Sequence, residues 1–292
     1  MLPNQVDYIK LYFRLFEEFS QTGAKPRRLG RPFDKGEKEL ITFFSMMIIR
    51  QVTDFKAQRR WLETHPYEQK ILGLKQIPHR TTLSRRFKNL YETVQAFVAF
   101  IGKWAEPLGS PFDSQLLFED ASLFKAAGPV WHQSDRRQGR IPEGLRRLDT
   151  DASWSKSGYQ GWVYGYKLHL TVNRQGFPKL VVVETASQAE GAVLDRKLND
   201  LLSFNLQALI ADNGYFKATR VRQWLKRYQL ILVTPATAWK TGRFAHAYHR
   251  FIHTQPTADW LKRRRTAIEP VFDLFRHILG TKKIVNNYQF KD

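Results

Sequence analysis

The sequence predicts an α/β protein in which a mixed β-sheet, flanked by helices, follows an all-helical N-terminal part. The first observation is a hairpin: residues 165–173 alternate in polarity, Gln175-Gly176 is typical of a turn, and residues 180–183 form a second apolar strand. The second is that segments with helical periodicity then alternate with short apolar runs. We expect helices over 190–203, 217–228 and about 258–279, and strands over 206–212 and 230–234.

The helical part is predicted to be a domain of its own, over residues 1–110, and residues 111–292 are predicted to form the α/β domain. Near the N-terminus, apolar side chains recur at helical spacing at Tyr8, Leu11 and Leu15. The helical pattern ends at residues 108–111, Leu-Gly-Ser-Pro, which contain helix breakers.

The chain is strongly basic. It has 47 Lys and Arg against 27 Asp and Glu, a formal net charge of +20. Such an excess repels itself in the folded state unless a polyanion neutralises it, so we expect nucleic acid as the partner. A charge that serves only solubility is the alternative. The absence of Cys excludes disulfides and thiolate metal sites, and we find no apolar run of membrane-spanning length and no secretory signal.

A basic helix in the N-terminal part is the candidate for reading DNA. Thr81, after Pro78, is the expected N-cap, and an apolar stripe runs from Leu83 to Ile101. A short helix, a turn and then a basic-ended helix is typical of a helix-turn-helix. A solvated basic helix in a bundle is the alternative. The candidate DNA-binding residues on this helix are Arg80, Thr82, Ser84, Arg85, Arg86 and Lys88.

Two acids follow apolar runs that are typical of buried strands. Asp120 follows residues 116–118, Leu-Leu-Phe, and Asp212 follows residues 208–211, Ala-Leu-Ile-Ala. We expect each carboxylate to lie where its strand ends, at the edge of the sheet. The alternative is an Asp that caps the backbone after it, which is common before Gly, as at Asp212-Asn-Gly214.

A third acid, Glu269, lies at the border of the apolar face of the last predicted helix. Arg265 and Arg276 flank it on the same side and are candidates for holding DNA phosphates. Pro270 predicts a kink or a new helical start there. Asp273 is the rival acid, and a surface ion pair between Glu269 and Arg265 is the alternative interpretation.

Hard carboxylate oxygens are the ligands that Mg²⁺ prefers. Three carboxylates from separate elements could hold the two ions that cleave a phosphodiester, one at the attacking and one at the leaving oxygen. Asp120, Asp212 and Glu269 are therefore our candidate metal ligands and catalytic residues.

Together these motifs resemble the DDE transposases of bacterial insertion sequences. The resemblance rests on Asp120-Ala-Ser122, residues 149–154, residues 162–170, Asp212-Asn-Gly-Tyr215, and Arg265-x-x-x-Glu269 with Arg276. It covers about residues 70–290. Where the family signature has a Tyr, this chain has Lys262, and Arg276 replaces its Lys.

The resemblance implies a ribonuclease H-like catalytic domain that uses Asp120, Asp212 and Glu269 with two Mg²⁺ ions, for which Mn²⁺ can substitute. It implies cleavage at the transposon ends, strand transfer into target DNA, and a homodimer that binds double-stranded DNA at the terminal inverted repeats. It also implies a cytoplasmic, nucleoid-associated bacterial protein. A non-catalytic regulator derived from a transposase and a plain metal-dependent nuclease are the alternatives.

Overall fold

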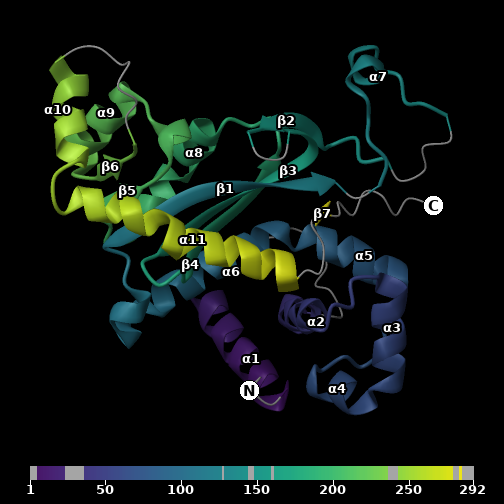
Figure 1. The fold of residues 1–292 in the computed structure, drawn as a ribbon. Coiled ribbons are helices and arrows are strands. Elements are labelled where there is room, and N and C mark those ends of the chain that lie inside the picture. Colours follow the sequence, from purple (N-terminus) through teal and green to yellow (C-terminus); the bar gives the residue numbers. More distant parts are fainter. Residues whose placement is uncertain are drawn as a thin grey trace.

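The computed structural model describes residues 5–23, 36–126, 128–143, 148–158, 161–235, 243–278 and 283–284. Helices occupy the N-terminal third, and a curled sheet flanked by helices follows (Figure 1). The N-terminal helices are α1 (Gln5–Gln21), α2 (Glu37–Ile49), α3 (Phe55–Thr64), α4 (Pro66–Ile71), α5 (Arg80–Asn89) and α6 (Tyr91–Trp104).

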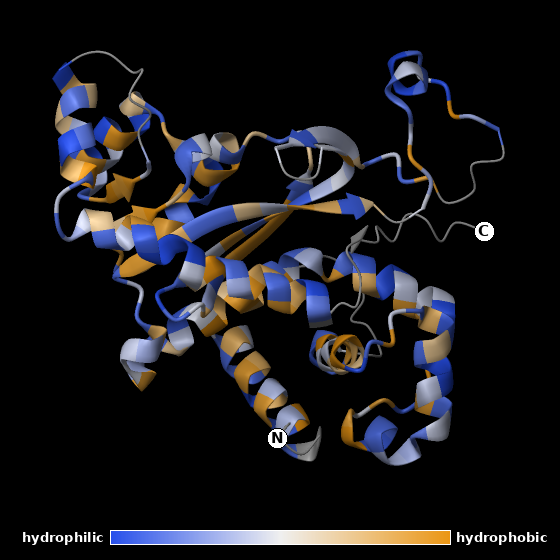
Figure 2. Cartoon of the chain, in the orientation of Figure 1, coloured by the Kyte–Doolittle hydropathy of each residue, from blue (hydrophilic) through white to orange (hydrophobic). Residues whose placement is uncertain are grey.

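Their apolar side chains form one hydrophobic cluster, in which Phe19, Phe43 and Met47 are completely buried. Figure 2 shows apolar residues gathered on α2, inside this helical part, and on the central strands of the sheet. A second cluster fills the sheet and its helices. The division into domains 1–110 and 111–292 stays a prediction, because α6 packs both in the helical cluster and along the sheet.

In the described part of the chain, the strands form one seven-stranded mixed sheet in the order β2-β3-β1-β5-β6, with β4 beside β3 and β7 beside β1. Strand β3 is antiparallel to both β1 and β4, whereas β5 and β6 run parallel to β1. This topology confirms the expected ribonuclease H-like sheet. The strands are β1 (Leu116–Ala126), β2 (Ser153–Ser157), β3 (Gly161–Asn173), β4 (Pro178–Thr185), β5 (Ala208–Ile210), β6 (Ile231–Val233) and β7 (Lys283–Ile284).

Helices cover both faces of the sheet (Figure 1). Neighbouring residues of a strand point to opposite faces. Glu119 of β1 contacts Lys197 of α8 (Glu190–Leu202), and Asp120 contacts Arg264 of α11 (Thr257–Ile278), so α8 and α11 lie on opposite faces. The helices and 3-10 turns of this part are η1 (Glu106–Leu108), η2 (Ser110–Phe112), α7 (Gln133–Arg137), α8 (Glu190–Leu202), η3 (Asn213–Tyr215), α9 (Ala218–Tyr228), α10 (Arg243–Ile252) and α11 (Thr257–Ile278).

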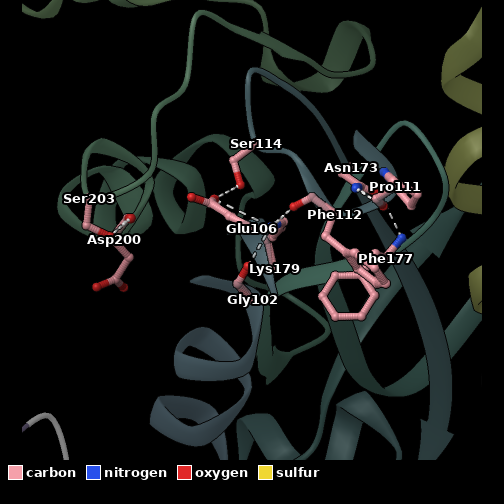
Figure 3. A network of polar contacts seen from close by, with 10 residues as sticks. All are labelled: Gly102, Glu106, Pro111, Phe112, Ser114, Asn173, Phe177, Lys179, Asp200 and Ser203. Atoms are coloured by element: carbon pink, nitrogen blue, oxygen red, sulfur yellow. Dashed lines mark hydrogen bonds and ion pairs between the residues drawn. The ribbon is translucent and has the colours of Figure 1, made fainter. Parts of the chain in front are cut away.

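The ammonium group of Lys179, in β4, links this strand to α6 by hydrogen bonds (Figure 3). It is completely buried, and it donates to the carbonyl oxygens of Gly102 and Phe112, each at 2.5 Å. Glu106, which supplies the counter-charge, lies 3.5 Å away. Gly102 permits this approach, because an added Cβ would lie 3.2 Å from the backbone of Lys179. A buried charge with three oxygen partners therefore joins the helical part to the sheet.

Three local predictions were wrong. Strand β1 does not end at Asp120 but continues to Ala126, because β3 pairs with it as far as Lys125. The N-cap of α5 is His79, not Thr81, since the His79 ring nitrogen accepts the Thr81 N–H. The apolar stripe from Leu83 to Ile101 belongs to two helices, which meet at Leu90.

Other elements follow the prediction closely. The expected helix near the C-terminus is α11, and it runs through Pro270 without a new start. The hairpin is β3 and β4, and the expected helices at 190–203 and 217–228 are α8 and α9. Among the described residues, no helix is both long and apolar enough to cross a membrane.

Candidate active site

The sheet brings Asp120, on β1, and Asp212, just beyond the end of β5, to the same level. Strand β5 runs parallel to β1 with Ile210 opposite Phe118. Asp120 lies two residues after Phe118, and Asp212 lies two residues after Ile210. The two carboxylates therefore emerge side by side where β5 ends. Their charges interact, because the Asp212 carboxylate helps to raise the pKa of Asp120.

Asp120 is held by one backbone donor and one cation. The Ala121 N–H donates to Oδ1 at 2.8 Å, and Nη1 of Arg264 lies 2.5 Å from Oδ2. Burial raises the pKa of Asp120 to about 6 despite Arg264, which acts in the opposite direction. Arg264 thus supplies a positive charge at the carboxylate.

Asp212 is the N-cap of η3. Its Oδ1 accepts the N–H of Gly214 at 2.8 Å, which is the capping role considered for this residue. That bond occupies only part of the acceptor capacity of a carboxylate. Asp212 can therefore cap the turn and still present oxygen atoms to a ligand.

Glu269 is not brought to the two Asp residues. Its side chain is 60% exposed, and its ion-pair partner is Arg265, with Nε 3.8 Å from Oε1. The rival acid, Asp273, pairs with Arg276 at 2.8 Å. In the ranges that the structure describes, no three Asp, Glu, His or Cys side chains are grouped so as to hold a metal ion. The convergence of Asp120, Asp212 and Glu269 stays a prediction.

Of the two arginines predicted to hold phosphates, Arg276 reaches the neighbourhood of Asp120. It donates to Oγ of Ser122, two residues further along β1, at 2.8 Å. The side chain of Arg265 is 77% exposed beside Glu269. Both arginines are therefore ion-paired with an acid one turn away on α11.

The candidate DNA-binding residues of α5 divide by burial. Arg80, Arg85 and Lys88 are exposed, Thr82 and Ser84 are half-buried, and Arg86 is buried. Next to the start of α5, the helices α3 and α5 border a groove rich in cations, which we call the basic groove. It is lined by Lys56, Arg59, Arg60, Glu63, His79 and Arg80.

The match to a known family decides what kind of protein this is. Residues 111–282, well over half of the chain, match the model of the transposase DDE domain. The chain belongs to this family. It is therefore a DNA transposase, as its resemblance to DDE transposases indicated, and the matched segment contains Asp120, Asp212 and Glu269.

Two solved structures are distantly similar to this DDE transposase. One is a pre-cleavage Mos1 transpososome, 9% identical, covering 97% of this chain and 92% of that one, with a TM-score of 0.23. The other is a mariner Mos1 paired end complex with Mg, 13% identical, covering 94% and 75%, with a TM-score of 0.24. Superpositions this poor do not establish a shared fold, so the assignment depends on the family match. No curated protein matches the chain.

The sequence prediction for this transposase missed a cation near Asp120 and an ion pair near Asp212. Arg264, not Arg265, is the cation of α11 that reaches Asp120. Its spacing was a usable signal, because Arg264 lies one turn before the buried Ile268. Glu190 and Lys167, which form an ion pair at 3.3 Å, were also missed. Lys167 alternates with the apolar residues of β3. Its side chain therefore lies on the face opposite to those residues, the face that Glu119 shares and α8 covers.

Proposed function

We propose that this transposase is a Mg²⁺-dependent polynucleotidyl transferase in which Asp120, Asp212 and Glu269 are the catalytic carboxylates. The observation that carries the proposal is the position of Asp120 on β1 and of Asp212 just after β5, level with each other within the DDE domain. Two carboxylates that emerge side by side from parallel strands can bridge divalent cations. Glu269 would join them from α11, after its side chain leaves Arg265.

The residues present suit Mg²⁺ as the cofactor, and Mn²⁺ as its substitute. The donors are carboxylate oxygens, the chain has no Cys, and the turn after Asp212 has a glycine that leaves room beside the carboxylate. When bound, the ions would activate the attacking oxygen and stabilise the leaving oxygen. Asp120 and Asp212 would hold them, and Arg276 beside Ser122 would contact phosphates of the DNA strand.

The proposed reaction has two displacements at phosphorus. Water attacks the phosphodiester at the transposon end, which leaves a 3′-hydroxyl and a 5′-phosphate. That 3′-hydroxyl then attacks a phosphodiester of the target DNA, and the target strand's own 3′-oxygen departs. Because two transposon ends must be joined to one target, we propose that a homodimer acts on double-stranded DNA, at the nucleoid of a bacterium.

We propose that the N-terminal helices read the terminal inverted repeats. The exposed side chains of Arg80, Arg85 and Lys88 on α5 would contact DNA, with Thr82 and Ser84 between them. Arg86 is buried, so its proposed part is to support the helix from within. The basic groove beside Arg80 would receive the phosphate backbone.

A supercoiled plasmid that carries the ends of the element, incubated with the protein and Mg²⁺ or Mn²⁺, tests this function. Joined products are expected from a transposase. Nicks without joining would indicate a nuclease, and a mobility shift without cleavage would indicate a regulator. Full cleavage by Asp120→Asn or Asp212→Asn would refute the assignment of the carboxylates.

A further inference from the structure

The carboxylate of Glu190 borders the same small space as that of Asp212. Glu190 is the first residue of α8, and η3, which Asp212 caps, packs against this helix. Gly214 shows how closely the two acids approach. A Cβ added there would lie 2.6 Å from Oε2 of Glu190 and 3.1 Å from Oδ1 of Asp212. Oxygen atoms of two carboxylates therefore face one space that the glycine leaves open.

The hydroxyl of Tyr215 is an independent sign that this region is built for a polar ligand. Tyr215 is completely buried, and its hydroxyl has no hydrogen-bond partner. Buried hydroxyl groups usually have one, so this one calls for a ligand or a water. The carboxylates that act on the phenol electrostatically are those of Glu119, Glu190, Asp120 and Asp212. All four carboxylates, Glu119 most strongly, therefore act on the unpartnered hydroxyl.

Several elements hold Glu190 in place. Its Oε1 lies 3.3 Å from Nζ of Lys167 in β3, and the same ammonium donates to the Gln188 carbonyl at 3.1 Å. From the other side, Arg220 of α9 donates to the carbonyls of Gly191 and Tyr215, at 2.8 Å and 2.7 Å. The start of α8 and the turn after Asp212 are therefore tied together, and Glu190 is not a freely moving surface acid.

An ion pair that only anchors the start of α8 is the simpler explanation of Glu190, since acids are favourable at helix N-termini. That explanation accounts for the contact between Oε1 of Glu190 and Lys167. It does not account for Oε2, which is directed at Gly214 beside Asp212. By comparison, Glu269 is 60% exposed and turned to Arg265. The contact at Gly214 and the unpartnered Tyr215 hydroxyl are what distinguish Glu190.

We propose that Glu190 is a further carboxylate of the divalent-cation site and holds the ion, or one of its waters, together with Asp212. The proposal rests on the proposed function, because it assumes a metal at Asp120 and Asp212. Glu190 would pair with the ion in place of the Lys167 ammonium, which compensates its carboxylate in the structure.

Metal binding to the full chain without DNA tests the proposal. Mn²⁺ is titrated and its free fraction is followed by electron paramagnetic resonance, for the wild type, Glu190→Gln and Asp212→Asn. Glu184→Gln is the matched control, because Glu184 is 28% exposed and ion-paired with Arg196, as Glu190 is 26% exposed and paired with Lys167. We expect Glu190→Gln to weaken binding about tenfold or more and Glu184→Gln to leave it unchanged.

Gly214→Ala tests the same space without removing a charge. Gly214 lies outside the left-handed region, so its backbone accepts Ala, and the new methyl group displaces the carboxylate of Glu190. We expect a loss of Mn²⁺ affinity that resembles the loss in Glu190→Gln.

The outcomes separate this proposal from the proposed function. If Asp212→Asn loses Mn²⁺ while Glu190→Gln and Gly214→Ala bind like the wild type, Glu190 is no ligand and the proposal is overturned, but the metal site stands. If Asp212→Asn also binds normally, the metal site itself is misplaced. A loss in Glu184→Gln equal to that in Glu190→Gln would show a mere charge effect and would also overturn the proposal.

Discussion

The buried histidine of β3 leads to a pH dependence of stability that can be measured without DNA or metal. His169 is completely buried, and neither ring nitrogen has a hydrogen-bond partner. Burial, with the nearby charges of Lys197, Lys167 and Arg196, lowers the pKa of His169 to about 3. An unfolded His has a pKa of about 6.5. Between these values the unfolded chain binds a proton that the folded chain does not, so the free energy of unfolding falls as the pH falls below about 6.5.

The size of the effect follows from this pKa difference. A pH of about 5 is about 1.5 units below the ordinary pKa of His, and each unit corresponds to about 1.4 kcal/mol. Keeping His169 unprotonated in the folded protein therefore lowers the free energy of unfolding by about 2 kcal/mol at about pH 5, relative to about pH 7. The variant His169→Leu removes the titrating group. Urea unfolding, followed by tryptophan fluorescence at both pH values, measures the free energy of unfolding for each protein.

The comparison between variants isolates this one group from the other titrating residues. The loss of stability between about pH 7 and about pH 5 is expected to be about 2 kcal/mol smaller in His169→Leu than in the wild type. His132→Gln, at an exposed position, is the control and is expected to keep the loss of the wild type. An equal loss in His169→Leu and in the wild type would refute the reasoning.

Three further predictions concern the proposed site and the DNA-binding helix. Asp120→Asn and Asp212→Asn are each expected to lower Mg²⁺-dependent cleavage of transposon ends at least about a hundredfold while end binding persists in a mobility-shift assay. Arg85→Ala is expected to weaken end binding and to reduce the salt slope of the binding constant by about 1. Arg86→Ala, at a buried position, is expected to lower the melting temperature instead. Unchanged footprints and an unchanged salt slope in Arg85→Ala would rule out the helix-turn-helix. Arg264→Gln leaves the Asp120 carboxylate without its cation, so Mg²⁺ is expected to raise the melting temperature more than in the wild type, and an equal or smaller rise would argue against a metal at Asp120.

The sheet was predictable from the sequence because its strands and helices carry strong patterns. The alternation over 165–173 and the turn at Gln175-Gly176 predict β3 and β4, and the apolar run before Asp212 predicts β5. Strand β2 was not predicted, because it consists of Ser153–Ser157, whose serines and lysine carry little apolar signal. It depends on pairing with the first residues of β3, a contact between separate segments that no local pattern reports.

The helical part shows the same limit at its ends. A histidine is an unusual N-cap, so propensity favoured Thr81, but the ring nitrogen of His79 takes the first free backbone N–H. The apolar stripe from Leu83 to Ile101 kept helical spacing across Leu90 and so concealed the break between α5 and α6. Spacing predicted the burial of Leu83, Leu90 and Phe97, but it did not predict where each helix stops, and it left Phe87 and Val94 exposed.

The candidate site shows what a local pattern leaves undecided. Residues 116–118 are all buried, so their polarity does not reveal which face of β1 each acid joins. Glu119 and Asp120 then point to opposite faces, where Glu119 makes a buried ion pair with Lys197, and Asp120 meets Arg264 beside Asp212. The family motif selects Asp120, whereas Glu190 comes close to Asp212 only because α8 packs against η3. A carboxylate that reaches a site through the packing of a helix leaves no trace in sequence spacing, which is why the third acid near Asp212 had to come from the structure.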